Sequence, residues 1–162
     1  MTTNLYAPPK AQVADIVQGE AAPALWNPGA AASWSLLLSP AFGAFLHMKN
    51  WEALEEPDKA AVAKKWVVFY LVTIIGLAVM GALLPYNKAI PGLLRLCGFV
   101  LLLSWYFISG KPQMEFVKSR YGKDYPRKGW AKPLLIAVGA IIGFVFVVGA
   151  VTGVAVFLVR RT

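Results

Sequence analysis

The sequence contains one cysteine and one histidine, which limits the chemistry open to the chain. Cys97 stands alone, so no internal disulfide and no cluster of thiolate metal ligands can form. His47 has no carboxylate close to it in the sequence, which argues against a haem or metal site. We therefore expect a protein without metal ions or other cofactors.

Charged residues are also scarce. They make up 15% of the chain and hydrophobic residues 58%, whereas soluble domains are about 25% charged and 45 to 50% apolar. The apolar residues are gathered in blocks, as membrane insertion requires. The sequence predicts an all-α integral membrane protein, with three to four transmembrane helices in a single membrane domain over residues 30–162.

Acidic residues are missing from every predicted span, although proton-coupled and cation-coupled carriers normally keep a carboxylate there. The chain also has no HExxH motif, no phosphate-binding loop and no recognisable pair of nucleophile and base. These absences predict that the protein is not an enzyme. Arg95 is the one charge within a span, and it lies near enough to the span's beginning to reach the interface.

The predicted spans cover residues 30–48, 66–84, 90–109 and 134–159. The last of them is uncharged over 26 residues, and as a helix it would reach roughly 39 Å across a hydrocarbon core of about 30 Å. The first is less regular, because Pro40 lies at its centre and Gly43 follows. We expect this first segment to span with a kink, the alternative being that it dips into the bilayer and returns.

Residues 1–29 contain four prolines and show no sustained hydrophobic period, so we predict a disordered tail. The opening NLYAPPK, residues 4–10, resembles the N-terminal tail of small polytopic bacterial inner-membrane proteins, including some of the RDD type. The run WSLLLSPAFGAFLHMKNW, residues 34–51, is similar to uncharacterised small membrane proteins of the same kind. The resemblance implies a bacterial inner-membrane setting and carries no activity with it.

Orientation is predicted by the basic residues near the span ends. Eleven lie in the connections 49–65 and 110–132, and these are Lys49, Lys59, Lys64, Lys65, Lys111, Lys118, Arg120, Lys123, Arg127, Lys128 and Lys132. Four tryptophans flank the same two connections, as in an interfacial aromatic belt: Trp51, Trp66, Trp105 and Trp130. We expect both connections to be cytoplasmic and the C-terminus periplasmic.

The final span carries two GxxxG spacings, formed by Gly139, Gly143, Gly149 and Gly153. At 100° per residue these glycines fall within an arc of about 120°, which lets another helix approach closely in lipid. The partner helix is either the chain's own hairpin, where Ala78 and Ala82 provide a small-residue pair, or a second polypeptide.

The connection 110–132 interleaves basic and aromatic side chains. We predict that it binds anionic lipid or a partner through Lys118, Arg120, Tyr121, Lys123, Tyr125, Arg127, Lys128 and Trp130, the alternative being charge that only sets orientation. Pro112 and Gly122 suit the two ends of a short interfacial helix, whose apolar face of Met114, Val117 and Tyr121 would lie among the headgroups.

The connection 49–65 begins with acidic residues, namely Glu52, Glu55, Glu56 and Asp58. This acidic cluster could dock against the basic connection, although a solvated face is the plainer interpretation. The net charge of +8 points to anionic lipid rather than nucleic acid as a partner.

Together these patterns predict a small, non-enzymatic inner-membrane protein that acts by helix packing and cytoplasmic-face binding. An accessory or regulatory subunit, or an immunity-type protein against a membrane-acting toxin, would fit this description. A homo-oligomer is the alternative to a protein partner, and a small oligomeric transporter or channel is the alternative function.

Overall fold

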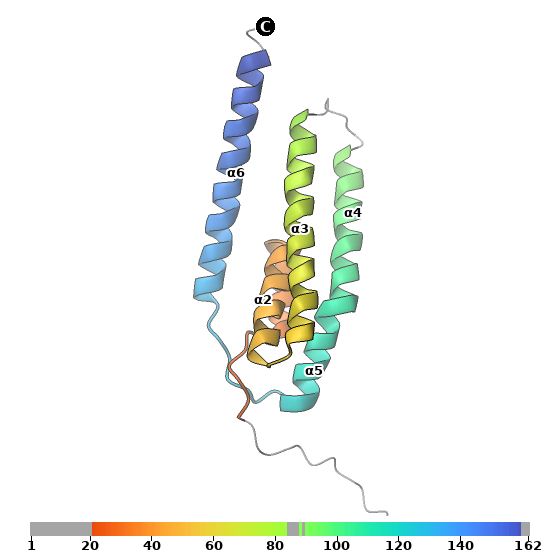
Figure 1. Cartoon of the computed structure of the whole chain (residues 1–162), viewed down its shortest axis with the longest axis vertical. Coiled ribbons are helices and arrows are strands. Elements are labelled where there is room, and N and C mark those ends of the chain that lie inside the picture. The colour runs from red at the N-terminus through yellow and green to blue at the C-terminus, as the bar shows by residue number, and fades with distance from the viewer. Residues whose placement is uncertain (1–20, 84–87, 89, 160–162) are drawn as a thin grey trace, which may run out of the picture.

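The computed structural model describes residues 21–83, 88 and 90–159, which are almost entirely helical (Figure 1). In chain order the helices are α1 (Pro28–Leu37), α2 (Pro40–Ala53), α3 (Pro57–Leu83), α4 (Ile90–Trp105), the π-helix η1 (Tyr106–Gly110), α5 (Lys111–Tyr121) and α6 (Ala131–Val159). Among the described residues, three helical stretches are long and apolar enough to cross a membrane: Pro57–Gly81, Ile90–Tyr121 and Ala131–Val151. The described residues are therefore all-α, as predicted, and three such helices are consistent with a multi-pass membrane protein.

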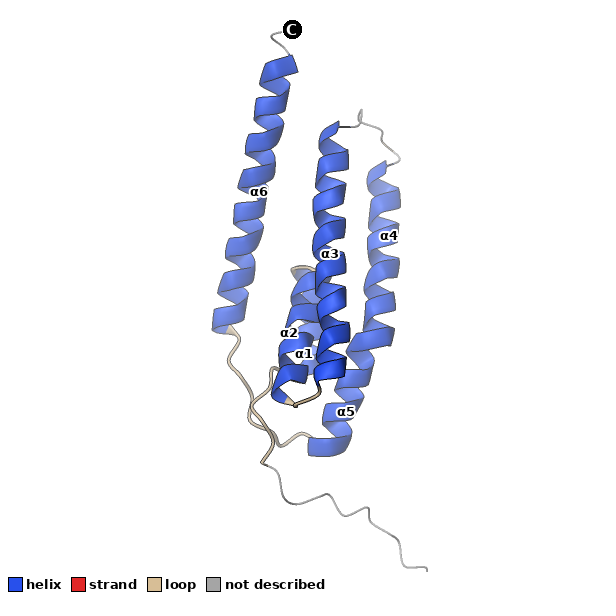
Figure 2. Cartoon of the chain, in the orientation of Figure 1, coloured by secondary structure: helices blue, strands red, loops and turns tan. Residues whose placement is uncertain are grey.

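The first apolar segment is an antiparallel helical hairpin, so the favoured kinked span was wrong. Ser39 accepts a hydrogen bond from the Phe42 N–H and Pro40 occupies the first turn, so these two residues begin a second helix. At the other end of the hairpin, the His47 ring bonds the Pro28 carbonyl. Both ends of the hairpin thus lie together, and its tip stops well short of the far end of α3 (Figure 2).

The predicted span 90–109 and the predicted interfacial helix form one continuous rod, from α4 through η1 into α5 (Figure 1). The Lys111 N–H bonds the Tyr106 carbonyl, a π-helical spacing. This wide turn comes directly before Pro112, whose missing N–H would interrupt an α-helical ladder. The π-helix carries the rod past the proline without a break.

A cluster of apolar side chains joins the hairpin, α3 and α5 at the end where the hairpin opens. This base cluster consists of Leu25, Trp51, Leu54, Ala60, Ala63 and Val117. Its alanines explain why α3 begins nine residues before the span predicted from Trp66. Ala60 and Ala63 are buried against the cluster, while Lys64 and Lys65 are exposed.

The predicted tail extends too far, because Leu25 is fully buried in the base cluster. The Leu25 N–H bonds the Pro126 carbonyl at 3.0 Å, and the Lys128 N–H bonds the Leu25 carbonyl at 2.9 Å. These bonds hold the segment before α1 beside the connection between α5 and α6. Of the predicted tail, residues 1–20 lie outside the described residues.

The helix α6 stands beside this assembly rather than within it (Figure 1). Most of its described large side chains are exposed, and Val145, Phe146 and Val147 are among the most exposed. Near its start, the rings of Trp130 and Trp34 lie 6.5 Å apart between centroids. The longest apolar helix is therefore the least packed one in the described chain.

Candidate functional site

Three polar side chains with no exposed surface lie between the hairpin and α5: His47, Asn50 and Gln113. The Asn50 amide accepts from the Trp26 N–H at 3.0 Å and donates to the Trp26 carbonyl at 2.8 Å and to Gln113 Oε1 at 3.3 Å. Gln113 Nε2 in turn donates to the His47 carbonyl at 2.8 Å. This polar network joins α5 to α2 and, through Trp26, to the segment before α1.

The imidazole of His47 is part of the packing. Its Nε2 lies 3.1 Å from the Pro28 carbonyl and donates to it, so Nδ1 carries no proton in the neutral ring. Burial lowers the pKa of His47 to about 4, against a smaller opposite effect of the Pro28 bond, so the ring is neutral at pH 7. The ring meets Trp105 edge to face, with centroids 5.2 Å apart.

Neither His47 Nδ1 nor Trp105 Nε1 has a hydrogen-bond partner among the described residues. Across the same residues, no group of three or more His, Cys, Asp or Glu side chains could hold a metal ion. A neutral imidazole held by a backbone carbonyl suits positioning of the hairpin better than acid–base chemistry. The polar network thus holds the hairpin and α5 in position.

The predicted lipid or partner residues lie on one end of the molecule. Lys118, Arg120 and Tyr121 are on the last turns of α5, and the rest are on the connection that follows: Lys123, Tyr125, Arg127, Lys128 and Trp130. One cavity of about 280 Å³ is lined by Lys118, Lys123, Tyr125 and Arg127, together with the start of α1. The remaining four face different neighbours.

Those four residues contact aromatic rings rather than the cavity. The Lys128 ammonium lies 4.5 Å from the centroid of the Trp26 ring. The Arg120 guanidinium lies 5.8 Å from the Phe116 ring centroid and 5.7 Å from that of Tyr121. Trp130 packs near Trp34 as described above. These contacts brace the base, so only part of the predicted set shares a site.

The apolar face predicted to lie among headgroups instead packs on the protein. Val117 is 2% exposed in the base cluster, and Tyr121 packs against the same cluster. The two connections do meet, but through Lys59, whose ammonium lies 4.2 Å from the Phe116 ring centroid and 4.9 Å from that of Trp51. The ion pair of Lys59 is local, with Glu56 at 3.2 Å.

The glycines of α6 face away from the other helices. A Cβ atom added at Gly139, Gly143, Gly149 or Gly153 would meet nothing within 4 Å. A different face of α6, with Ile136, Ala140 and Phe144, lines an apolar cavity of about 570 Å³ shared with α2 and α3. These three lie at about 60°, 100° and 140° around the helix from Gly139, outside the glycine arc.

The glycine arc therefore does not pack against α3 in the structure. Ala78 is half-buried on α3, and the side chain of Ala82 lies outside the described part. The glycine arc therefore has no neighbour within the described chain.

Sequence reasoning missed the polar network and the closest helix contact. At Gly43 an added Cβ would overlap Ser35 Oγ and lie 2.9 Å from the Trp105 ring, so α1, α2 and α4 meet there. No local pattern links Asn50 to Gln113, which are 63 positions apart. The only signal in the sequence was an amide side chain next to apolar segments, because an amide that becomes buried there needs a hydrogen-bond partner.

Comparison of the chain with models of protein families, with curated proteins and with solved structures found no match.

Proposed function

We propose that this is a non-enzymatic membrane protein that presents α6 to a transmembrane helix of another polypeptide. Its task would be that of an accessory or regulatory subunit, or of an immunity-type protein that occupies a membrane-acting toxin. The observation that carries the proposal is the open glycine arc of α6, where an added Cβ would meet nothing within 4 Å.

Helix association in lipid depends on close backbone approach, because lipid tails are as apolar as the helices themselves. Four glycines on one face, spread over about 120°, provide such an approach over several turns. The remainder of the chain supplies the anchor, since the polar network and base cluster hold the hairpin, α3 and α5 together. Because these contacts do not involve the glycine arc, that face of α6 is available to a partner.

Orientation is part of the proposal. The hairpin base and both basic connections lie at one end of the bundle, and the last described turns of α6 lie at the other (Figure 1). The rule that basic connections stay inside then assigns the base to the cytoplasm of a bacterial inner membrane. A reporter that is active only in the periplasm should be silent when fused after Lys123, and strong activity there would reverse the assignment.

The partner is tested by affinity capture from native membranes followed by mass spectrometry. The double variant Gly143→Ile/Gly149→Ile should lose the captured polypeptide, because the added side chains fill the arc and hold the partner helix away. The control Val145→Ile/Val147→Ile changes residues at about 240° and 80°, outside the arc, and should retain it. Equal capture by both variants would remove α6 as the contact surface.

The identity of the captured polypeptide decides between the alternatives. A different protein supports the subunit or immunity-type role. Capture of a second copy of this chain would favour a homo-oligomer, and with it a small channel or transporter built around α6. Ion or solute flux in liposomes then separates a pore from a structural oligomer.

A further inference from the structure

The cavity at the base of the molecule is a basic one. Lys118, Lys123 and Arg127 line it, and no acidic residue does. Among the described residues these three side chains form no ion pair; the pairs at this end join Lys49 to Glu52, Lys59 to Glu56 and Lys111 to Glu115. Three converging cations without a carboxylate suit a phosphate group.

Two further features of this cavity favour an anion. Its wall includes Asn27, Pro28 and Gly29, which are the cap and first turn of α1, where the helix dipole is positive. Tyr125 also lines the cavity, and burial raises the pKa of its phenol despite the opposite effect of Arg127. The phenol therefore keeps its proton at neutral pH and can donate a hydrogen bond.

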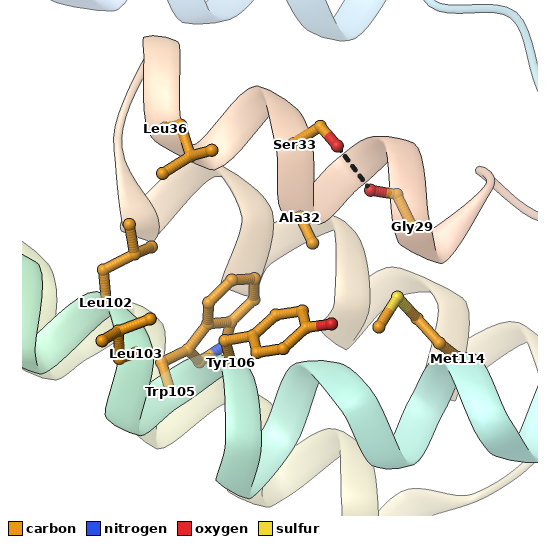
Figure 3. A pocket seen from close by; sticks show the side chains of 9 residues that line it. All are labelled: Gly29, Ala32, Ser33, Leu36, Leu102, Leu103, Trp105, Tyr106 and Met114. Carbon is orange, nitrogen blue, oxygen red and sulfur yellow. Dashed lines mark hydrogen bonds between the residues drawn. The ribbon is translucent and has the colours of Figure 1, made fainter.

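An apolar groove of about 530 Å³ begins where the basic cavity ends. It runs between α1 and the rod of α4 and η1, with Ala32 and Leu36 on one side and Leu102 and Leu103 on the other (Figure 3). The ring of Tyr106 lies along the same groove (Figure 3). Such a lining suits a hydrocarbon chain.

Gly29 and Met114 line both the cavity and the groove, so the two are adjoining parts of one surface. A Cβ added at Gly29 would lie 3.6 Å from Met114 Sδ. A small residue at position 29 therefore keeps the junction open, whereas a large one would close it.

We propose that this surface is a binding site for one anionic phospholipid, with the phosphate among the three cations and an acyl chain in the groove. The inference does not depend on the function proposed for α6. Free phosphate shares the headgroup chemistry, but it would leave the groove unused. The continuity of cavity and groove is the reason for assigning a whole lipid.

Native mass spectrometry of the full chain in detergent tests the assignment. Phosphatidylglycerol should remain bound, while phosphatidylcholine and glycerol phosphate, each at the same concentration, should not. The triple variant Lys118→Gln/Lys123→Gln/Arg127→Gln should retain phosphatidylglycerol roughly tenfold less well or worse, because each cation contributes to holding the anionic headgroup. The control Lys64→Gln/Lys65→Gln/Lys132→Gln removes the same charge from exposed positions and should bind normally.

A second variant examines the groove with all three cations intact. Gly29→Leu should weaken retention of phosphatidylglycerol by closing the junction, while its thermal midpoint in lipid-free detergent verifies that it is folded. Equal retention by the native chain and the triple variant would overturn the proposal, as would equal losses in the triple variant and its control. Binding of glycerol phosphate as tight as that of the lipid would replace the phospholipid with a free phosphate ester.

Discussion

The base of the molecule and α6 are held in opposite ways. At the base, the fully buried amide side chains of Asn50 and Gln113 join segments 63 and 66 positions apart by hydrogen bonds, the second of them to the backbone carbonyl of His47. Along α6, most described side chains are apolar and exposed, and a Cβ added at any glycine of the arc would meet no atom of the described residues within 4 Å. Apolar composition thus indicates that a helix lies in the membrane, but not whether it packs against the other helices of the chain.

This difference has an energetic consequence. A buried amide that loses its partner exposes the full cost of desolvation, about 1 to 3 kcal/mol for each orphaned group. An exposed glycine in lipid loses no contact when it is enlarged. We therefore expect substitutions at the base to alter the free energy of unfolding, and substitutions in the glycine arc to alter association only.

The largest effect is expected from Asn50→Ala. The change leaves the Trp26 N–H, the Trp26 carbonyl and Gln113 without their partner, which should lower the free energy of unfolding by about 3 to 5 kcal/mol. Denaturant unfolding in detergent, followed by circular dichroism, measures the loss. Ser119→Ala is the control, because its exposed hydroxyl bonds only the Phe116 carbonyl nearby, and a similar loss there would contradict the role of the network.

Acidification should weaken the same region. The pKa of His47 falls from 6.5 to about 4 on folding, so the unfolded chain binds more protons between these values. The contribution of neutral His47 to the free energy of unfolding is fully present above pH 6.5. It declines as the pH falls towards 4, by about 3 kcal/mol in all. Stability curves between pH 7.5 and 4 should therefore flatten in His47→Gln, and an unchanged slope in that variant would remove His47 as the cause.

A smaller effect is expected where α1, α2 and α4 meet. Gly43→Ala introduces a Cβ that overlaps Ser35 Oγ, and relief of this overlap should cost about 1 to 3 kcal/mol. The same substitution at Gly139 meets nothing within 4 Å, so it should be neutral or stabilising by up to about 1 kcal/mol. Thermal midpoints of the two variants in one detergent provide the comparison, and equal midpoints would show that the hairpin is not closely packed.

The smallest effect on stability is expected from Gly143→Ile/Gly149→Ile. Both added side chains project into open space, so the thermal midpoint of the isolated chain should stay within a few degrees of the native value. A midpoint lowered as much as in Asn50→Ala would mean that the arc packs within the chain.

Much of the fold could be predicted because hydrophobic blocks identify membrane helices directly. The three long spans and the shared end of the two basic connections follow from such blocks and from the connection lengths. The hairpin was misjudged because Pro40 was considered as a helix breaker, whereas Ser39 before it makes the pair a helix start.

The site was harder to predict, since its parts come together only through tertiary packing. Lys118, Lys123 and Arg127 were identified as candidates, but nothing in their spacing indicated a shared cavity with the start of α1. The outward direction of the glycine arc was equally hidden, because periodicity defines a face without saying what lies opposite it. The π-helix η1 before Pro112 could not be predicted either, because no pattern of hydrophobic residues distinguishes it from an α-helix.

Whether the glycine arc of α6 contacts another polypeptide can be measured by site-specific photo-crosslinking in native membranes. A photoreactive residue at position 143 lies in the glycine arc, whereas one at position 141 lines the cavity shared with α2 and α3. We expect position 143 to form an adduct with a second polypeptide, while position 141 crosslinks within the chain and leaves its mass unchanged. Crosslinking of position 143 only to residues of α3 would contradict the claim that this face of α6 is open to a partner.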